Sequence, residues 1–127
     1  MILYGASGHA KVIIEILENS GIPIDGLFDD NPEIKSLYGY TCTQFSERMM
    51  LNNKLIISIG DNKIRKLITE KMGDVKYGIA IDSTSILSKR ATIGLGSVIM
   101  PGVIINSGTL IGCGTLVRTR EATIQSL

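Results

Sequence analysis

The stretch IDSTSILSKRATIGLGSVIMPGVIINSGTLIGCGTLV, residues 81–117, repeats with a period of six residues. One column of the repeat is aliphatic throughout and comprises Ile81, Leu87, Ile93, Ile99, Ile105, Ile111 and Val117. The column four places later is small or β-branched and comprises Ser85, Ala91, Ser97, Val103, Thr109 and Thr115. A six-residue period predicts a parallel β-helix, in which each hexapeptide supplies one short strand and one corner. Three hexapeptides then close one triangular coil.

The two columns have different expected places in such a coil. The aliphatic side chains should point into the coil, and the small side chains should fit near the corners. Glycines follow the aliphatic column or lie in the turns, where they permit backbone angles that other residues resist, and they are Gly94, Gly96, Gly102, Gly108, Gly112 and Gly114. The alternative is an ordinary β-sandwich, but sandwich strands alternate with period two and do not favour a register of six.

Length, composition and charge limit the possible classes of protein. The chain has 127 residues, with 44% hydrophobic and 20% charged residues, so it should fold around a core. A net charge of +1 gives no reason to expect nucleic acid or an anionic membrane as a partner. No apolar run reaches the length of a membrane span, and the first residues do not resemble a signal peptide.

The cysteine and histidine pattern predicts no metal site. Cys42 and Cys113 lie far apart and form no ligand spacing with His9, the single histidine. We expect both cysteines to be buried and the protein to be cytoplasmic.

The chain opens with the pattern of a nucleotide-binding βα unit. An apolar run at residues 1–4 is followed by Gly5-Ala-Ser-Gly-His-Ala-Lys11 and by a helix-period segment. Its inward face is expected to contain Ala10, Ile13, Ile14 and Leu17. The motif is G-x-x-G-H-x-K and differs from the dinucleotide fingerprint G-x-G-x-x-G. Gly5 and Gly8 could let the backbone approach a phosphate at the helix N-terminus, and a plain glycine turn is the alternative.

A second strand is predicted at Ile24–Phe28, followed by Asp29 and Asp30. An acid about twenty residues beyond the glycine turn can accept hydrogen bonds from a ribose. The alternative is that Asp-Asp-Asn-Pro serves only as a turn.

The following segment predicts less regular structure. Lys35–Thr43 is polar and is expected to be irregular, with a turn at Gly39. Gln44–Leu51 is expected to be a short helix that covers the sheet with Phe45 and Met49, and with Met50 as a further candidate.

Leu55–Ile59 is the clearest buried parallel strand of the chain, and Gly60-Asp61-Asn62 follows it. Asp61 or Asn62 is expected to cap a further helix. The inward residues of that helix should be Ile64, Leu67, Ile68 and Met72, and the solvated face should contain Lys63, Arg65 and Lys66.

Strands that alternate with helices predict a parallel α/β sheet. Its strand ends should gather Gly5–Lys11, Asp29-Asp30 and Gly60–Asn62 at one edge, where open α/β sheets bind ligands. The candidate substrate-binding residues are Gly5, Ser7, Gly8, His9, Lys11, Asp29, Asp30, Gly60, Asp61 and Asn62. The domain boundaries are expected at residues 1–77 for the sheet, 78–117 for the partial β-helix and 118–127 for a divergent tail.

The two parts together resemble the family of sialic acid O-acetyltransferases and sugar N-acetyltransferases of bacterial surface-glycan pathways. The resemblance rests on Gly5–Lys11, Phe28–Pro32, Ser58–Asn62 and the hexapeptides from Ile93 to Leu116, and it covers the chain up to about Val117. It implies a Rossmann-like domain followed by a left-handed parallel β-helix, assembled as a trimer. It also implies acetyl-CoA as donor and the amino or hydroxyl group of a nucleotide-activated or acidic sugar as acceptor.

The resemblance also implies roles for the candidate residues. The N-terminal loop and Asp29-Asp30 would hold the nucleotide part of the acceptor, and Gly60–Asn62 would close that site. His9 matches a loop histidine near the acceptor sugar, where it would serve as an auxiliary polar contact or proton acceptor. The alternative for His9 is a cap of the helix start.

The chain departs from the family after Val117. In the family, further hexapeptides lead to a segment resembling Asp-His-Asp-Cys, whose histidine is the general base. This sequence has no histidine after His9, so no catalytic residue is assigned. Glu121 stands in the small column and Thr123 in the aliphatic column, so both columns fail in one repeat. We expect a C-terminally truncated family member with an incomplete acetyl-CoA site and loosely ordered or partner-covered last repeats.

Three functions follow as hypotheses. The first is an acetyl-CoA-dependent sugar acetyltransferase by family. The second is a non-catalytic module that binds a nucleotide sugar and has a vestigial β-helix. The third is a dinucleotide-dependent oxidoreductase or sensor, against which the absence of G-x-G-x-x-G counts.

Overall fold

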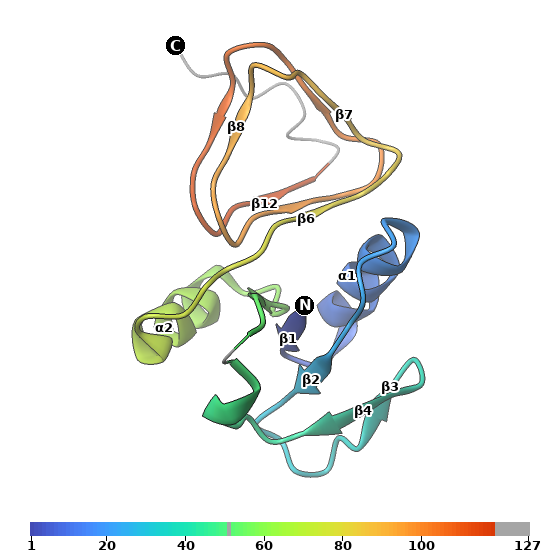
Figure 1. The fold of residues 1–127 in the computed structure, drawn as a ribbon, viewed down its shortest axis with the longest axis vertical. Helices are drawn as coiled ribbons and strands as arrows, with labels where there is room; N and C mark the ends of the chain where they lie inside the picture. Colours follow the sequence, from blue (N-terminus) through green and yellow to red (C-terminus); the bar gives the residue numbers. More distant parts are fainter. Residues whose placement is uncertain (51, 119–127) are drawn as a thin grey trace.

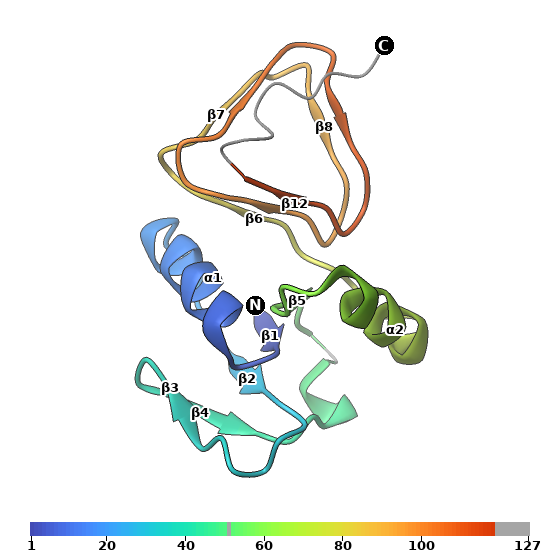
Figure 2. The same cartoon turned by 180° about the vertical axis from the view of Figure 1, so that it is seen from behind.

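The protein consists of an α/β part and a triangular coil that lie next to each other (Figures 1 and 2). The computed structural model describes residues 1–50 and 52–118, so the prediction for the tail, with Glu121 and Thr123, lies outside the described residues. The α/β part contains β1 (Ile2–Tyr4), α1 (Gly8–Asn19), β2 (Gly26–Phe28), β3 (Ser36–Leu37), β4 (Tyr40–Thr43), the 3-10 helix η1 (Glu47–Met50), β5 (Leu55–Ile57) and α2 (Asn62–Met72). The coil contains β6 (Ala80–Ile81), β7 (Ile86–Leu87), β8 (Thr92–Ile93), β9 (Val98–Ile99), β10 (Ile104–Ile105), β11 (Leu110–Ile111) and β12 (Leu116–Val117).

The α/β part is built on one sheet with strand order β3-β4-β2-β1-β5. β1 pairs in parallel with β2 and β5, and β2 pairs in parallel with β4. Alternate residues of the strands enter two different cores, because successive side chains of a strand point to opposite faces. Leu3 packs with α1 on one face, and Ile2 and Tyr4 pack on the other face with residues from α2. The predicted α/β fold with a parallel sheet is confirmed.

Helix α1 has the inward face that its sequence period predicts. Its buried residues are Ala10, Ile13, Ile14, Ile16 and Leu17. The helix ends before Gly21, whose positive φ of 70° suits glycine.

The prediction for α2 is wrong in part. No residue of α2 is buried, and Ile64 and Leu67 have exposed fractions of 46% and 64%. Only Ile68 and Met72 pack against the sheet. α2 packs on β5, which is the edge strand of the sheet, so the apolar period of the helix overstates its buried face.

The prediction for Lys35–Thr43 is wrong in its irregular structure and confirmed in its turn at Gly39. The segment forms the antiparallel hairpin β3–β4, which turns at Tyr38 and Gly39 with positive φ values of 49° and 84°. β4 then extends the sheet beyond β2. The two strands are too short to show a recognisable alternation of apolar and polar residues in the sequence. The neighbouring helix is shorter than predicted and of the 3-10 type. Phe45 and Met50 pack against the core on this face of the sheet, whereas Met49 is exposed.

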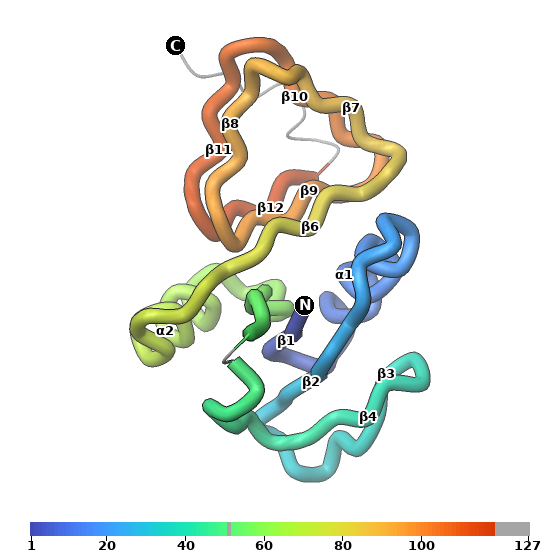
Figure 3. Tube along the Cα trace, in the orientation of Figure 1, coloured from blue at the N-terminus to red at the C-terminus, as the bar shows by residue number. Residues whose placement is uncertain are grey.

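The repeat folds into triangular turns of parallel strands, which are clearest in the tube of Figure 3. β6 pairs with β9 and β9 with β12, β7 pairs with β10, and β8 pairs with β11. Paired residues are eighteen positions apart, as in Ile81↔Ile99, which equals three hexapeptides. The aliphatic column forms the core of the coil, and its members pack with Val103, Ala91 and Met100. Among the small column, Ser97, Val103 and Thr109 are buried.

One face of the coil packs against the α/β part. Ala80 and Val98, which precede members of the aliphatic column, are buried in the same core as α1. The Ser20 hydroxyl at the end of α1 donates a hydrogen bond to the Ile81 carbonyl at 2.8 Å. Cys42 is buried as predicted, but Cys113 is exposed, since it lies in the turn that follows β11.

Candidate functional site

Three strand ends meet at one edge of the sheet. Tyr4 of β1 lies opposite Phe28 of β2 and Ile57 of β5, so the segments that follow these residues leave the sheet together. They are Gly5–Ser7, Asp29-Asp30 and Ser58–Asp61. The structure therefore brings the predicted glycine loop, the acids and the Gly60 segment to the same edge.

Gly5 requires glycine for two independent reasons. Its φ of 119° is unfavourable for other residues. A Cβ atom at Gly5 would lie 2.6 Å from Ile59 Cγ1 and 2.9 Å from the Ser58 carbonyl oxygen. The first residue of the loop is thus pressed against the end of β5.

Ser58 links the two segments at this contact. Its side chain is buried, and its hydroxyl donates a hydrogen bond to the Gly5 carbonyl at 2.6 Å. The Gly5 amide donates to the Phe28 carbonyl at 2.6 Å, so the loop is also tied to β2. Ser58 was missed as a site residue, although it is the single polar residue in an apolar run.

Asp29 holds the glycine loop. One carboxylate oxygen accepts from the Ala6 amide at 2.8 Å, and the other accepts from the Asn31 amide at 2.9 Å. The bond from Asn31 fits the turn alternative for the Asp-Asp-Asn-Pro segment, and the bond from Ala6 adds a tie to a distant loop. Asp29 therefore positions the site. Hydrogen bonding of Asp29 to a ribose stays a prediction.

Asp30 is oriented by Tyr4. The Tyr4 hydroxyl donates to Asp30 Oδ1. Burial of the phenol, together with this carboxylate, raises the pKa of Tyr4 to about 12, so the hydroxyl stays protonated and remains a donor. Tyr4 was not predicted as part of the site.

The start of α1 offers open backbone. Ser7 is the N-cap residue, and its side chain makes no capping hydrogen bond. Among the described residues, none comes within 4 Å of a Cβ atom built on Gly8. The helix N-terminus therefore presents amide groups on a side that these residues leave open, an arrangement that suits an anion. Lys11 lies in the first turns of α1, with its Nζ atom 5.7 Å from the centre of the Tyr38 ring.

His9 lies between the glycine loop and the second helix. A Cβ atom built on Gly60 would be 3.6 Å from His9 Cβ, so the two loops touch there. Burial, and then the charges of Arg65 and Arg118, lowers the pKa of His9 below its ordinary value. The imidazole is thus neutral at physiological pH and can accept a proton or a hydrogen bond. Ser7 occupies the cap position, so His9 is not the N-cap.

Asp61, Asn62 and Arg65 build the third segment. Asp61 caps α2 by accepting from the amides of Lys63 and Ile64 at 2.9 and 3.0 Å. Arg65 donates to the carbonyls of Ile59 and Gly60 at 3.1 and 3.0 Å and to the Asn62 side chain. The prediction of a merely solvated Arg65 is wrong, because its guanidinium closes the loop after β5.

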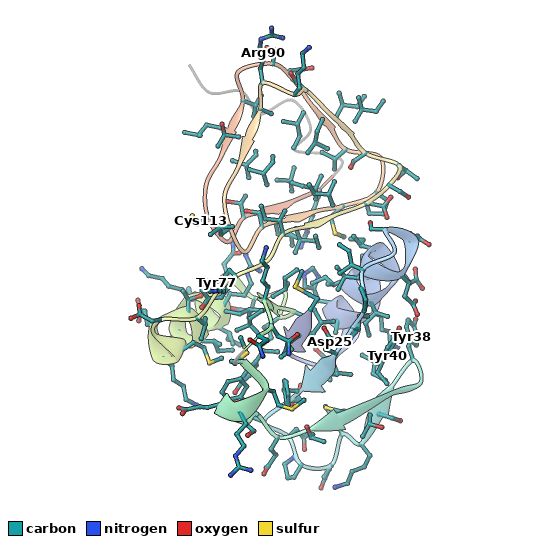
Figure 4. All side chains as sticks on the ribbon, in the orientation of Figure 1. Asp25, Tyr38, Tyr40, Tyr77, Arg90 and Cys113 are labelled. Carbon is teal, nitrogen blue, oxygen red and sulfur yellow. The ribbon has the colours of Figure 1, made fainter. Side chains whose placement is uncertain are left out.

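Two cavities flank α2. The first, of about 490 Å³, lies between α2 and a corner of the coil, and its lining includes Arg65, Lys66, Tyr77 and Cys113. Figure 4 shows Tyr77 and Cys113 at this junction. The Tyr77 hydroxyl is buried and finds no hydrogen-bond partner among the described residues. The second cavity, of about 630 Å³, lies between η1 and α2 and includes Tyr4 and Asp30.

Within residues 1–50 and 52–118, no three His, Cys, Asp or Glu side chains are grouped so that they could hold a metal ion. In the same part of the chain, no helix has the length and apolar character needed to cross a bilayer.

Residues 1–72 match the family model described as the PglD N-terminal domain. That match covers more than half of the chain. The chain belongs to the sugar N-acetyltransferase family. UDP-N-acetylbacillosamine N-acetyltransferase from Bacillus subtilis is 31% identical over 109 residues, which are 77% of this chain and 50% of that protein. The recognition of the family from its motifs is confirmed.

Solved structures of this family have the same fold. A histidine-to-asparagine mutant of perosamine N-acetyltransferase from Caulobacter crescentus, in complex with CoA and GDP-perosamine, superimposes with a TM-score of 0.84 at 27% identity. The match covers 92% of this chain and 59% of that one. The acetyltransferase domain of PglB from Neisseria gonorrhoeae, in complex with acetyl coenzyme A, gives a TM-score of 0.77 at 25% identity and covers 92% and 60%. The chain thus spans a little over half the length of these family members.

Proposed function

We propose that this chain binds a nucleotide-activated sugar at the edge formed by the ends of β1, β2 and β5, as part of an acetyl-CoA-dependent sugar acetyltransferase of surface-glycan biosynthesis. The single observation that carries the proposal is the junction of the glycine loop, the two acids and the Gly60 segment at one sheet edge. The family relatives support it, since one structure contains both CoA and GDP-perosamine. The acceptor would be an amino or hydroxyl group of the sugar.

Each candidate residue has a proposed role that follows from its contacts. The diphosphate would lie at the open backbone of Ser7 and Gly8, where the helix N-terminus favours negative charge. Asp30 would accept hydrogen bonds from the nucleoside. His9, neutral and partly buried beside Gly60, would contact the sugar. Lys11, Asp61 and Asn62 would border the same site.

The coil is proposed to be the beginning of a left-handed parallel β-helix, with the division between the two parts near residue 78. The direction of winding in Figure 3 supports this hand. Acetyl-CoA would bind along this β-helix in the assembled protein. The free thiols of Cys42 and Cys113 are in keeping with a cytoplasmic protein.

The outer faces of the coil support the proposed homotrimer. Ile86 and Ile104 are paired neighbours on the β7–β10 face and have exposed fractions of 64% and 49%. Leu110 on the β8–β11 face is 60% exposed. Adjacent apolar side chains on a solvent face are typical of an interface. Light scattering should give three times the mass of one chain, and Ile104→Glu should lower it.

A non-catalytic binding module is the second candidate, and the histidine content favours it. His9 is the only histidine of the 127 residues and lies in the α/β part, so the coil offers no imidazole as general base. Calorimetry of the chain with nucleotide sugars and with acetyl-CoA separates the two candidates. Binding of both ligands, with release of CoA above a protein-free blank, supports the transferase. Binding of the nucleotide sugar alone supports the module, and binding of neither contradicts both.

A further inference from the structure

The cavity between η1 and α2 adjoins the proposed diphosphate position. Tyr4, which lines the cavity, directly precedes Gly5 of the glycine loop. Asp30, which also lines it, follows Asp29, and Asp29 accepts the hydrogen bond from the Ala6 amide. A ligand whose phosphates lie at the start of α1 therefore has this cavity next to it on the α2 face of the sheet.

The floor of the cavity is aromatic and apolar. Phe45 lies with its ring centre 5.5 Å from that of Tyr4, at an interplanar angle of 41°. It also contacts Phe28 edge-on at 5.6 Å. Met50, Met72 and Val75 complete the apolar lining. Flat aromatic and thioether surfaces of this kind suit the face of a nucleobase.

The polar part of the cavity lining is rich in hydrogen-bond acceptors. It contains three carboxylates, Asp30, Glu47 and Asp74, together with Gln44 and one cation, Lys71. The carboxylate of Asp30 is held in place by the Tyr4 hydroxyl through Oδ1. Excess negative charge disfavours phosphate in the cavity itself, and ionised carboxylates only accept hydrogen bonds. The cavity therefore selects for a group that presents N–H donors.

Family membership leaves the identity of the base open, because one relative is named for a UDP-sugar and another structure contains GDP-perosamine. Guanine carries two adjacent donors, N1–H and the 2-amino group, which match the two oxygens of a carboxylate. Uracil presents one N–H between two carbonyl oxygens, and those oxygens would face the carboxylates unfavourably. We propose that this cavity is the base subsite of the nucleotide sugar and that its carboxylates select guanine over uracil. The inference rests on the proposed function of nucleotide-sugar binding.

Calorimetric titration of the full chain with GDP, IDP and UDP tests the selection. IDP keeps N1–H and lacks the 2-amino group, so it isolates one donor. We expect GDP to bind at least about tenfold more tightly than UDP, with IDP in between, since a bidentate contact to a base gives about five- to a hundredfold discrimination. Glu47→Gln and Asp30→Asn should reduce the preference for GDP over IDP or UDP. Glu47 lies in an exposed 3-10 helix, so its substitution should leave folding intact.

Glu15→Gln is the matched control, because Glu15 is an exposed carboxylate on α1 that does not line the cavity. The preference of the Glu15→Gln variant for GDP over UDP should equal that of the wild type. UDP binding as tightly as GDP, or an unchanged preference in both Glu47→Gln and Asp30→Asn, overturns the base selection and leaves nucleotide binding standing. Failure of all three diphosphates to bind overturns nucleotide binding and the base subsite together.

Discussion

The coil and the α/β part differ in the contacts that hold them together. The coil repeats one sequence separation, whereas the α/β part relies on individual contacts between distant residues. In the coil, every paired residue is eighteen positions from its partner, and each pair of the inward column joins two aliphatic residues. In the α/β part, the site depends on single contacts between residues far apart, such as Ser58 with Gly5 and Asp29 with Ala6. A repeat can therefore be recognised from its period, whereas the site has no period to reveal it.

The largest expected effect comes from Gly94→Ala in the coil. A Cβ atom there would lie 2.4 Å from the Cys113 amide nitrogen and 2.5 Å from the Gly112 carbonyl carbon. Both atoms are backbone and cannot move without separating two coils, so we expect a loss of about 3 kcal/mol or more in the free energy of unfolding. Denaturant titration measures it.

Gly112 occupies the same column eighteen residues later and serves as the control. Within the part of the chain that the structure describes, a Cβ atom there would meet only Thr115 Oγ1, at 3.8 Å. Gly112→Ala should therefore cost less than Gly94→Ala. Equal losses in the two variants would show that the stacking of the coils does not decide the need for glycine.

The next effect concerns the glycine loop. Gly5→Ala combines a positive φ with contacts to Ile59 and Ser58, and should destabilise the protein by about 1–3 kcal/mol. Gly8 has a helical position, and no described residue lies within 4 Å of an added Cβ atom, so Gly8→Ala should leave stability unchanged or raise it by about 0.5 kcal/mol. If the diphosphate lies at Gly8, this stable variant should still lose affinity for GDP or UDP. Calorimetry measures the affinity, and unaltered binding by Gly8→Ala would move the diphosphate elsewhere.

A smaller effect is expected at the N-termini of the two helices, where one N-cap side chain makes capping hydrogen bonds and the other makes none. Asp61 accepts from two backbone amides of α2, so Asp61→Ala should cost about 1 kcal/mol. Ser7 makes no capping hydrogen bond at α1, so Ser7→Ala should have little effect on thermal stability. A destabilisation by Ser7→Ala as large as that by Asp61→Ala would mean that α1 is capped in solution by its serine.

The smallest effect is the pH dependence of His9. Burial and the charges of Arg65 and Arg118 lower its pKa, so the folded protein binds the proton less tightly than the unfolded chain. Stability should therefore decrease as the pH falls through the ordinary value near 6.5, and level off below the lowered pKa. His9→Asn removes this contribution, so its melting temperature should decrease less between pH 7.5 and 5.5. Parallel pH profiles for the two proteins would contradict the lowered pKa.

Several features of the α/β part follow from the sequence because they depend on neighbours along the chain. The inward face of α1 and the Asp61 cap belong to this class. The buried face of α2 and the hairpin β3–β4 do not, because they depend on how far the sheet extends. Ile64 and Leu67 have the right period for a core, but α2 packs on the edge strand β5 and leaves them exposed.

The sequence alone determined the triangular coil at residues 81–117, since a period of six brings each strand onto the one three repeats away. It also determined the family and the three segments of the site, because their glycines and acids follow apolar strands. Only the tertiary structure decided what those segments do to one another. Tyr4 orients Asp30, Ser58 fixes Gly5, and Arg65 closes the loop after β5. These contacts join residues that no local pattern relates, so packing of the sheet and its helices had to bring them together.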